Sequence, residues 1–195
     1  MNGANPLLAG QNLTLVRGGR QLFEGVSLSL AAGDVLLLRG PNGAGKSSLL
    51  LTLAGLLRPA SGTIGPDEPP PMHLLAHSSA VKSRLTLAEN LTFWRRVNGE
   101  TGLAVEAALE RVGLGGLGAI EAGHLSAGQT RRLALARLVV TDRKIWLLDE
   151  PLAALDDAGA RLLAALVAER AASGGGIIAA THDDIPGATG TLMLT

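Results

Sequence analysis

The stretch RGPNGAGKSSLLLTLAGLLRP, residues 39–59, opens with three glycines and a lysine that lie between an apolar run, 35–38, and a second apolar stretch with helical spacing. Residues 40–47 match the pattern G-x-x-x-x-G-K-[ST] in full. The run before the loop predicts a buried strand over Val35–Arg39, and the residues after it predict a helix from Lys46 to about Leu57. A loop of this kind between a strand and a helix is expected to wrap phosphates.

The residues predicted to bind nucleotide phosphates form one continuous segment. They are Gly40, Pro41, Asn42, Gly43, Ala44, Gly45, Lys46, Ser47 and Ser48. Gly43 and Gly45 allow backbone N–H groups to approach an anion, because no Cβ stands in the way. Lys46 would bring a positive charge to the outer phosphates, and Ser47 would offer a hydroxyl to Mg²⁺.

A second part of the site is predicted at the end of the apolar strand IWLLDE, residues 145–150. Neighbouring side chains on a strand point to opposite faces, so Asp149 and Glu150 are expected to have different tasks. Asp149 is predicted to hold Mg²⁺ through its water shell. Glu150 is predicted to orient and polarise the water that attacks the γ-phosphate.

Composition limits the class of protein. The length of 195 residues fits one compact domain, and the absence of cysteine removes disulfides and thiolate metal sites. The apolar runs are broken by charges well short of a bilayer span, and residues 1–10 show no export signal. The cytoplasm is therefore the expected compartment, and a net charge of +0 gives no reason to expect a nucleic-acid partner.

The remaining pattern predicts an α/β fold with a parallel sheet, because apolar strands alternate with helices. Strands over 12–16 and 26–30 are expected to pair antiparallel through the turn 17–20. The other expected strands are 72–76, 145–148 and 177–180. Helices are expected over 85–97, over 104–112, after Gly128 to Val140, and over 158–172.

Residues 125–129, LSAGQ, decide between the classes of phosphate-loop enzyme. Together with the Asp149-Glu150-Pro151 strand end, they resemble the ATPases of ABC transporters, whose signature is L-S-G-G-Q; Ala127 replaces one glycine. The resemblance covers nearly the whole chain. It implies one domain, 1–195, with a P-loop (RecA-like) core, a mixed sheet, an antiparallel β lobe and a small helical subdomain at about 85–140.

The resemblance also implies a second group of nucleotide-binding residues. They are Ser126, Ala127, Gly128 and Gln129 of the signature, with Asp156 of the segment 153–156, which resembles the family's D-loop. In this family the signature closes on the ATP of a partner subunit, which implies a homodimer with ATP sandwiched between its subunits. His182, after the last predicted strand, matches the histidine that contacts the γ-phosphate.

Two positions depart from the family. Ser78 stands where a glutamine usually contacts Mg²⁺ and the attacking water, so its contact is expected to run through water. Arg17 stands where an aromatic side chain stacks on adenine. Its guanidinium could stack on the base, or it could be a solvated turn residue.

A closer resemblance links residues 76–94 and 125–156 to the small ATP-binding subunits of cytochrome c maturation haem exporters. Six residues match a segment of that family: Lys82, Leu85, Thr86, Glu89, Asn90 and Leu91. The resemblance implies ATP hydrolysis with Mg²⁺, powering haem export or release of a haem carrier. It implies a transmembrane permease subunit as partner, with this chain peripheral on the cytoplasmic face of the inner membrane.

Alternative interpretations are an ATPase of another small ABC exporter and a slow nucleotide-sensing module of the ABC class. The G-x-G-x-x-G pattern at 113–118 follows a helix, which argues against a dinucleotide site. Arg131, Arg132 and Arg137 lack interleaved aromatic residues and are expected on a solvated or phosphate-facing surface. No haem is expected to bind, because His73, His77 and His124 lack the paired spacing of such a site.

Overall fold

A computed structural model describes residues 5–195, which form two compact units. The first unit comprises the chain up to Ala76, Lys144–Pro151 and Leu166–Thr195. The second comprises His77–Arg143 and Leu152–Ala165. Within residues 5–195, the structure contains no helix with the length and apolar character needed to cross a membrane.

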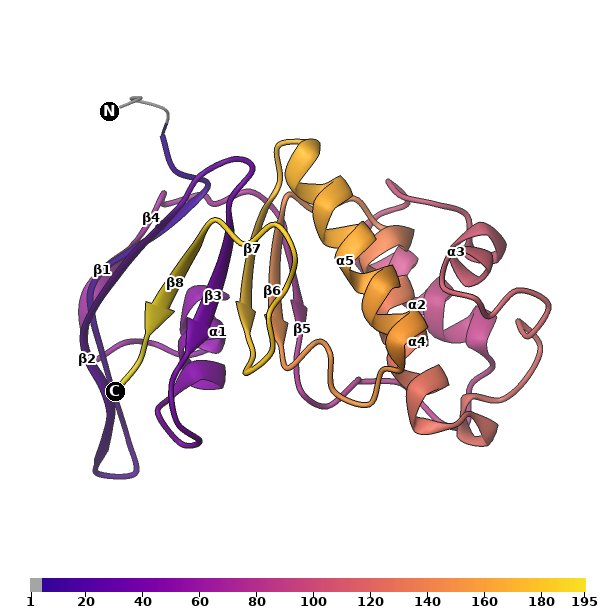
Figure 1. The fold of residues 1–195 in the computed structure, drawn as a ribbon, viewed down its shortest axis with the longest axis horizontal. Coiled ribbons are helices and arrows are strands. Elements are labelled where there is room, and N and C mark those ends of the chain that lie inside the picture. Colours follow the sequence, from indigo (N-terminus) through magenta and orange to yellow (C-terminus); the bar gives the residue numbers. More distant parts are fainter. Residues whose placement is uncertain (1–4) are drawn as a thin grey trace. The chain divides into compact units, whose positions relative to one another are not determined.

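A parallel sheet of five strands forms the centre of the first unit, in the order β5-β6-β7-β3-β8 (Figure 1). Its strands are β3 (Val35–Arg39), β5 (Met72–Leu75), β6 (Ile145–Asp149), β7 (Gly176–Ala180) and β8 (Gly190–Met193). Every residue of β6 and β7 is buried, as their continuous apolar sequences predict for the inner strands of a parallel sheet. The phosphate loop follows β3, which is paired on both sides.

A second sheet of the first unit is antiparallel and has the order β2-β1-β4. Its strands are β1 (Leu8–Arg17), β2 (Arg20–Leu30) and β4 (Ser61–Gly65). Gly18 and Gly19, both with positive φ, form the tight turn between β1 and β2. The predicted antiparallel pair is confirmed, and its strands are longer than the apolar alternation indicated.

The core of the first unit joins the two sheets and helix α1 (Lys46–Leu53). Leu49, Leu50 and Leu53 of α1 are at most 2% exposed and pack with buried residues of both sheets. Burying a leucine side chain contributes about 2 kcal/mol, so these contacts fix the helix that begins at the phosphate loop. Trp146 of β6 is also in this unit, 2% exposed, with the guanidinium of Arg170 5.2 Å from its ring centroid.

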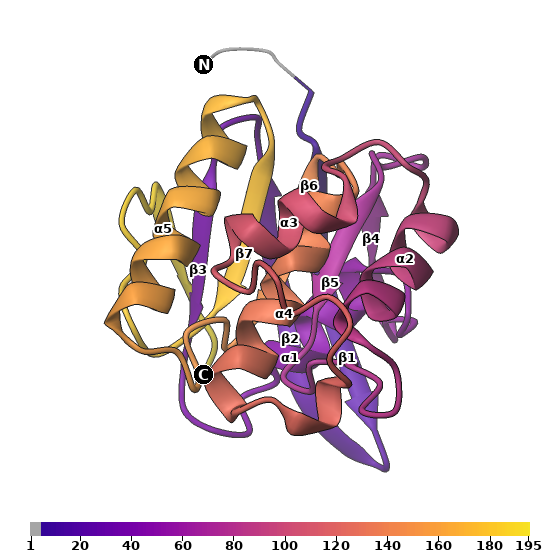
Figure 2. The ribbon, with the colours of Figure 1, turned by 90° about the vertical axis from the view of Figure 1, so that its right-hand side faces the viewer.

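The second unit is mainly helical, and Figure 2 shows α2, α3 and α4 gathered together. Its elements are α2 (Leu87–Asn98), α3 (Val105–Arg111), the short 3₁₀ helix η1 (Ala122–His124) and α4 (Ala127–Val140). Helix α5 (Asp157–Ala172) contributes its residues 157–165 to this unit and 166–172 to the first. Apolar residues of all three main helices are buried, including Leu91, Leu109 and Leu133.

The predicted α/β fold is confirmed, with a parallel and an antiparallel sheet. The helix predicted to reach about Leu57 ends earlier, at Leu53, because Gly55 adopts a left-handed φ of 74°. Strands β4 and β8 were not predicted. Both are short, and neither contains the apolar alternation that marks a strand in sequence.

Candidate nucleotide site

The phosphate loop, residues 40–45, connects β3 to α1. At two of its positions, Gly40 and Gly45, the backbone conformation or its surroundings require a glycine. Gly45 is the N-cap of α1 and has a φ of 93°. A Cβ on Gly40 would lie 2.3 Å from the carbonyl oxygen of Leu194, so a side chain there would collide with backbone. Helix α1 follows directly, and the N–H groups of its first turn are the donors that bind anions at helix N-termini.

Lys46 lies folded over this loop. Its side chain is buried, at 7% exposed, and Nζ donates to the carbonyl oxygens of Gly40 at 2.8 Å and Pro41 at 3.3 Å. These bonds keep the buried charge satisfied. Because phosphate oxygens are stronger acceptors for an ammonium than carbonyl oxygens, the lysine is ready to exchange them for a nucleotide.

Asp149 and Glu150 lie at the end of β6 in different surroundings. Asp149 is the last strand residue, is 6% exposed and pairs with Ala180 of β7. Glu150 has a φ of 45°, which is rare for a residue with a side chain, and its N–H donates to the carbonyl of Ala180 at 2.8 Å. The turn at Glu150 separates the two carboxylates, and such backbone strain is concentrated at functional sites.

His182 connects these parts. Its Nε2 lies 3.2 Å from Oδ1 of Asn42, 3.4 Å from Nζ of Lys46 and 3.8 Å from Oε1 of Glu150. The first unit therefore brings together one residue from the loop, the loop lysine, the strand-end glutamate and the histidine. All four were predicted as site residues from the sequence, and their catalytic roles remain predictions.

The oxygen ligands that Mg²⁺ prefers are available at the two positions predicted for it in the first unit. Ser47 is exposed in the first turn of α1, and Asp149 is the last residue of the buried strand β6. A hydroxyl and a carboxylate fit this ion, which usually keeps several waters and takes its other ligands from phosphate oxygens. Ser78, the third predicted ligand, is an exposed residue of the second unit, and its role remains a prediction.

Arg17 is exposed at the end of β1, where it pairs with Arg20 across the hairpin turn. The position is that of a turn residue, and its stacking on a base stays a prediction.

The LSAGQ segment forms the start of α4 in the second unit. Ser126 is the N-cap: its Oγ accepts from the Gln129 N–H at 3.2 Å, and its own N–H donates to Oε1 of Gln129 at 3.0 Å. This capping box leaves the hydroxyl proton of Ser126 free to donate. Gly128 lies close to Ala154: a Cβ added at Gly128 would be 3.2 Å from the Ala154 carbonyl oxygen, so a glycine fits best there.

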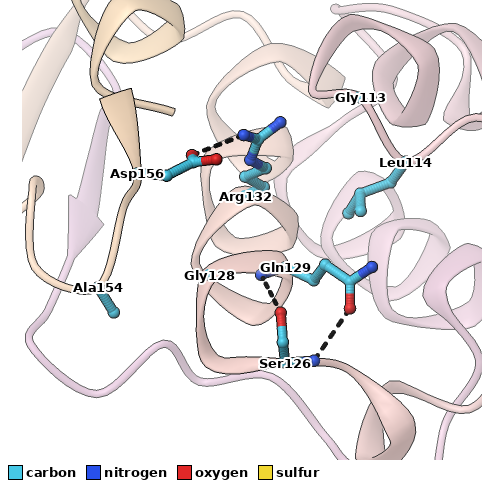
Figure 3. A pocket seen from close by; sticks show the side chains of 8 residues that line it. All are labelled: Gly113, Leu114, Ser126, Gly128, Gln129, Arg132, Ala154 and Asp156. Atoms are coloured by element: carbon cyan, nitrogen blue, oxygen red, sulfur yellow. Dashed lines mark hydrogen bonds and ion pairs between the residues drawn. The ribbon is translucent and has the colours of Figure 1, made fainter. Parts of the chain in front are cut away.

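A hollow of about 380 Å³ lies at this helix start (Figure 3). Its lining includes Ser126, Gly128, Gln129, Arg132 and Asp156. Arg132 donates to Oδ1 of Asp156 at 2.7 Å, and the guanidinium, with the N–H of Gly159, holds the pKa of the Asp156 carboxyl below its usual value. Four of the five signature and D-loop residues named from the sequence therefore line this hollow, and the fifth, Ala127, does not.

The three arginines of α4 were predicted on a solvated or phosphate-facing surface, and two of them are not solvated. Arg131 and Arg137 are 5% and 8% exposed, because α4 packs against both α2 and α3. The Arg137 guanidinium lies 3.7 Å from the ring centroid of Trp94, and its Nη1 donates to the Ser79 carbonyl at 3.0 Å. Burial lowers the pKa of Arg137 to about 10, so it stays protonated at neutral pH. Neither side chain is available to a nucleic acid.

Fold and site together define a P-loop nucleotide-binding protein with an additional helical unit. The family model described as ABC transporter matches residues 23–153, more than half of the chain. The chain therefore belongs to the ABC transporter family, and the resemblance seen in its motifs is confirmed.

Curated relatives cover nearly the whole chain. The protein named "Cytochrome c biogenesis ATP-binding export protein CcmA" from Rhodopseudomonas palustris (strain BisB5) is 48% identical over 91% of this chain and 92% of its own length. A protein of the same name from Mesorhizobium japonicum is 48% identical over 90% of this chain and 91% of its own length. Another from Paramagnetospirillum magneticum is 47% identical over 91% of this chain and 89% of its own length.

Solved structures support the fold. A putative ABC transporter ATP-binding protein from Pyrococcus furiosus has a TM-score of 0.83 at 24% identity and covers 96% of both chains. The ATP-binding cassette MJ0796, described as a dimeric post-hydrolysis state bound to ADP and Pi, has a TM-score of 0.82 at 21% identity, covering 96% of this chain and 94% of that one.

Proposed function

We propose that this chain is the ATP-hydrolysing subunit of an ABC exporter that acts in cytochrome c biogenesis. The support is its membership of the ABC transporter family and the printed name of relatives that are 47% to 48% identical over about nine tenths of the chain. The cargo is proposed as haem, or alternatively ATP powers release of a haem-loaded carrier.

One observation carries the hydrolytic part of the proposal: the imidazole of His182 lies beside both the loop lysine and the carboxylate of Glu150. In the proposed reaction, Lys46 leaves its two carbonyl partners and donates to the outer phosphates. Glu150 polarises the attacking water, and the His182 ring donates to the γ-phosphate. Asn42, near the same ring, would keep the imidazole oriented before ATP arrives.

Mg²⁺ would be held by the Ser47 hydroxyl and, through water, by Asp149, with Ser78 as a further water-mediated contact. The ion would neutralise charge on the phosphates when bound. The first-turn N–H groups of α1 would donate to the same phosphates. Residues 40–48, which comprise the phosphate loop and the start of α1, would therefore bind the triphosphate together with the ion.

We also propose that the working ATPase is a homodimer. The hydroxyl of Ser126 and the free N–H groups at the start of α4 offer donors to an anion, and the hollow beside them contains Asp156. In the proposed dimer these donors, with Ala127, Gly128 and Gln129, contact the ATP held by the phosphate loop of the other copy. Arg17 would stack on the adenine.

The proposed membrane partner is the permease subunit of the cytochrome c maturation system, with this chain on its cytoplasmic side. A deletion strain complemented with the wild-type gene tests the pathway. Covalent haem in c-type cytochromes should be lost on deletion, return with the wild type and stay absent with Lys46→Ala. Normal holo-cytochrome c in the deletion strain would instead assign the chain to another ABC exporter.

The enzyme activity is tested separately on purified protein. Wild-type protein should release phosphate from Mg-ATP, and Glu150→Gln should bind ATP without turnover. Binding without hydrolysis by the wild type, with or without its co-purified membrane partner, would indicate a nucleotide-sensing module.

A further inference from the structure

Arg39 is the last residue of β3 and immediately precedes the phosphate loop, yet its side chain extends to a different segment. Its Nη1 donates to the carbonyl oxygen of His182 at 2.5 Å, and its Nη2 donates to that of Asp183 at 3.1 Å. The same Nη2 forms an ion pair with the carboxylate of Asp184. One guanidinium therefore holds three consecutive residues of the loop that contains the predicted catalytic histidine.

The histidine loop, residues 181–189, is anchored at its ends, where the N–H groups of Thr181 and Thr189 donate to the carbonyls of Leu38 at 3.3 Å and Val35 at 2.8 Å. Ile185 is also anchored, at 3% exposed, and the exposed residues between Thr181 and Ile185 are the part that Arg39 holds. In the described chain, residues 181–189 lie between β7 and β8 outside any helix or strand, and residues 182–184 are exposed. The His182 side chain is 53% exposed, so packing does little to fix the position of the ring. A local bond from the Asp183 N–H to Oγ1 of Thr181, at 3.0 Å, anchors the loop at its start.

The Arg39 backbone, in contrast, is fixed on both sides. Its carbonyl accepts from the Leu194 N–H at 2.8 Å, and it stands in register with Met193 of β8. The preceding residue, Leu38, is paired with Ala180 of β7. The side chain is 22% exposed, which leaves its guanidinium partly shielded from water. A rigid strand thus presents a planar donor fork to a segment that has no regular structure of its own.

We propose that Arg39 is a positioning residue for His182. By holding the carbonyl groups of His182 and Asp183, it keeps the imidazole within 3.2 Å of the Asn42 side chain and 3.4 Å of Lys46 Nζ. Arg39 does not touch the nucleotide in this proposal. The inference rests on the proposed function, because a positioned histidine matters only if His182 acts on the γ-phosphate.

The two carbonyl bonds are the important part of this contact. Asp184 is 96% exposed, and an ion pair with so exposed a carboxylate contributes little. A planar guanidinium can serve two neighbouring carbonyl groups at once, whereas a lysine ammonium is a single point that lacks this geometry. Arg39→Lys should therefore keep the charge and lose most of the positioning.

Steady-state ATP hydrolysis by the full chain tests the proposal. Arg39→Met should lower kcat about tenfold and change the KM for ATP less than about twofold, because substrate contacts are intact while the geometry of a catalytic group is not. Arg39→Lys should also lower kcat more than it changes KM, but by less than Arg39→Met does. Arg58→Met, at an exposed arginine of the same unit, is the matched control and should leave both constants unchanged. An unchanged kcat in Arg39→Met would overturn the proposal.

A double-mutant comparison separates positioning from general structural damage. In a His182→Ala background, adding the Arg39→Met substitution should leave the single-turnover rate unchanged, since the group being positioned is gone. An equal further loss in that background would mean that Arg39 acts elsewhere, which contradicts the proposal. If Arg39→Met fails to fold, the same comparison is made with Arg39→Lys.

A second readout does not depend on turnover. The chain contains four histidines, and the ring signal of His182 in an NMR spectrum is identified by its loss in His182→Gln. Arg39→Met should shift this signal while leaving those of the other three in place, and a signal that does not move would refute the placement. If Arg39→Met shifts the His182 signal but the wild type hydrolyses no ATP, the proposed function is contradicted. The positioning of the His182 ring by Arg39 is then still supported.

Discussion

At the scale of single residues, Lys46 is the buried cation that we expect to bind the outer phosphates. Its Nζ donates to two loop carbonyl oxygens, and phosphate oxygens are stronger acceptors for an ammonium than these. We expect Lys46→Ala to weaken ATP binding by roughly 100-fold, equivalent to about 2–3 kcal/mol for a charge-assisted bond. Titration calorimetry with ATP measures this change.

The matched control for Lys46 is Lys144→Ala, which removes an exposed lysine from the same unit. Its ATP affinity should equal that of the wild type. Equal affinities in all three proteins would mean that the loop does not bind the outer phosphates through its lysine.

Asp156 gives a pH-dependent prediction, because Arg132 holds its pKa below the usual 3.8. A folded-state pKa below the unfolded value means that the ionised carboxylate stabilises the fold at neutral pH. This contribution is lost as the pH falls through the folded-state pKa. We expect Asp156→Asn to lower the urea midpoint slightly at pH 7, and the difference from wild type to shrink below pH 3.8. A difference that grows in acid would contradict the assignment.

At the scale of elements, helices α2 and α4 both begin with a capping box. Thr86 with Glu89 caps α2, and Ser126 with Gln129 caps α4. Removing the hydroxyl of such a cap costs about 1 kcal/mol. We therefore expect Thr86→Ala and Ser126→Ala to lower the free energy of unfolding by about the same amount, measured in urea.

The two caps should differ in function, because only Ser126 is proposed to contact ATP. Thr86→Ala should keep the wild-type rate of ATP hydrolysis, whereas Ser126→Ala should lose at least about tenfold, because one donor to developing charge is removed. Equal rates in the two variants would argue against a role of the LSAGQ hydroxyl in catalysis.

The elements differ in how well the sequence predicts them. The phosphate loop was predictable because its function requires a continuous run of residues. Asp149 and Glu150 were predictable because they stand at the end of an apolar strand. Strand β4 was not predictable from the sequence, because its residues are stabilised by pairing with β1 and show no strand pattern of their own. The burial of Arg137 depends on the Trp94 ring from another helix, which no spacing along α4 reveals.

At the scale of the whole molecule, the proposal requires two copies. Glu150→Gln should bind ATP and stall before hydrolysis, so the closed dimer should accumulate. Size-exclusion chromatography with light scattering should show a dimer with saturating ATP and a monomer without it. The double variant Lys46→Ala/Glu150→Gln is the control and should stay monomeric. A stalled single variant that remains monomeric would contradict the shared site.

The placement of the two tryptophans has a practical consequence for spectroscopy. The chain has no tyrosine, and Trp146 lies in the first unit while Trp94 lies in the second. Ultraviolet emission from Trp94→Phe therefore reports only on the first unit, and emission from Trp146→Phe only on the second. Comparing the two emission curves during denaturation shows directly whether the β-rich and helical units melt together or in sequence.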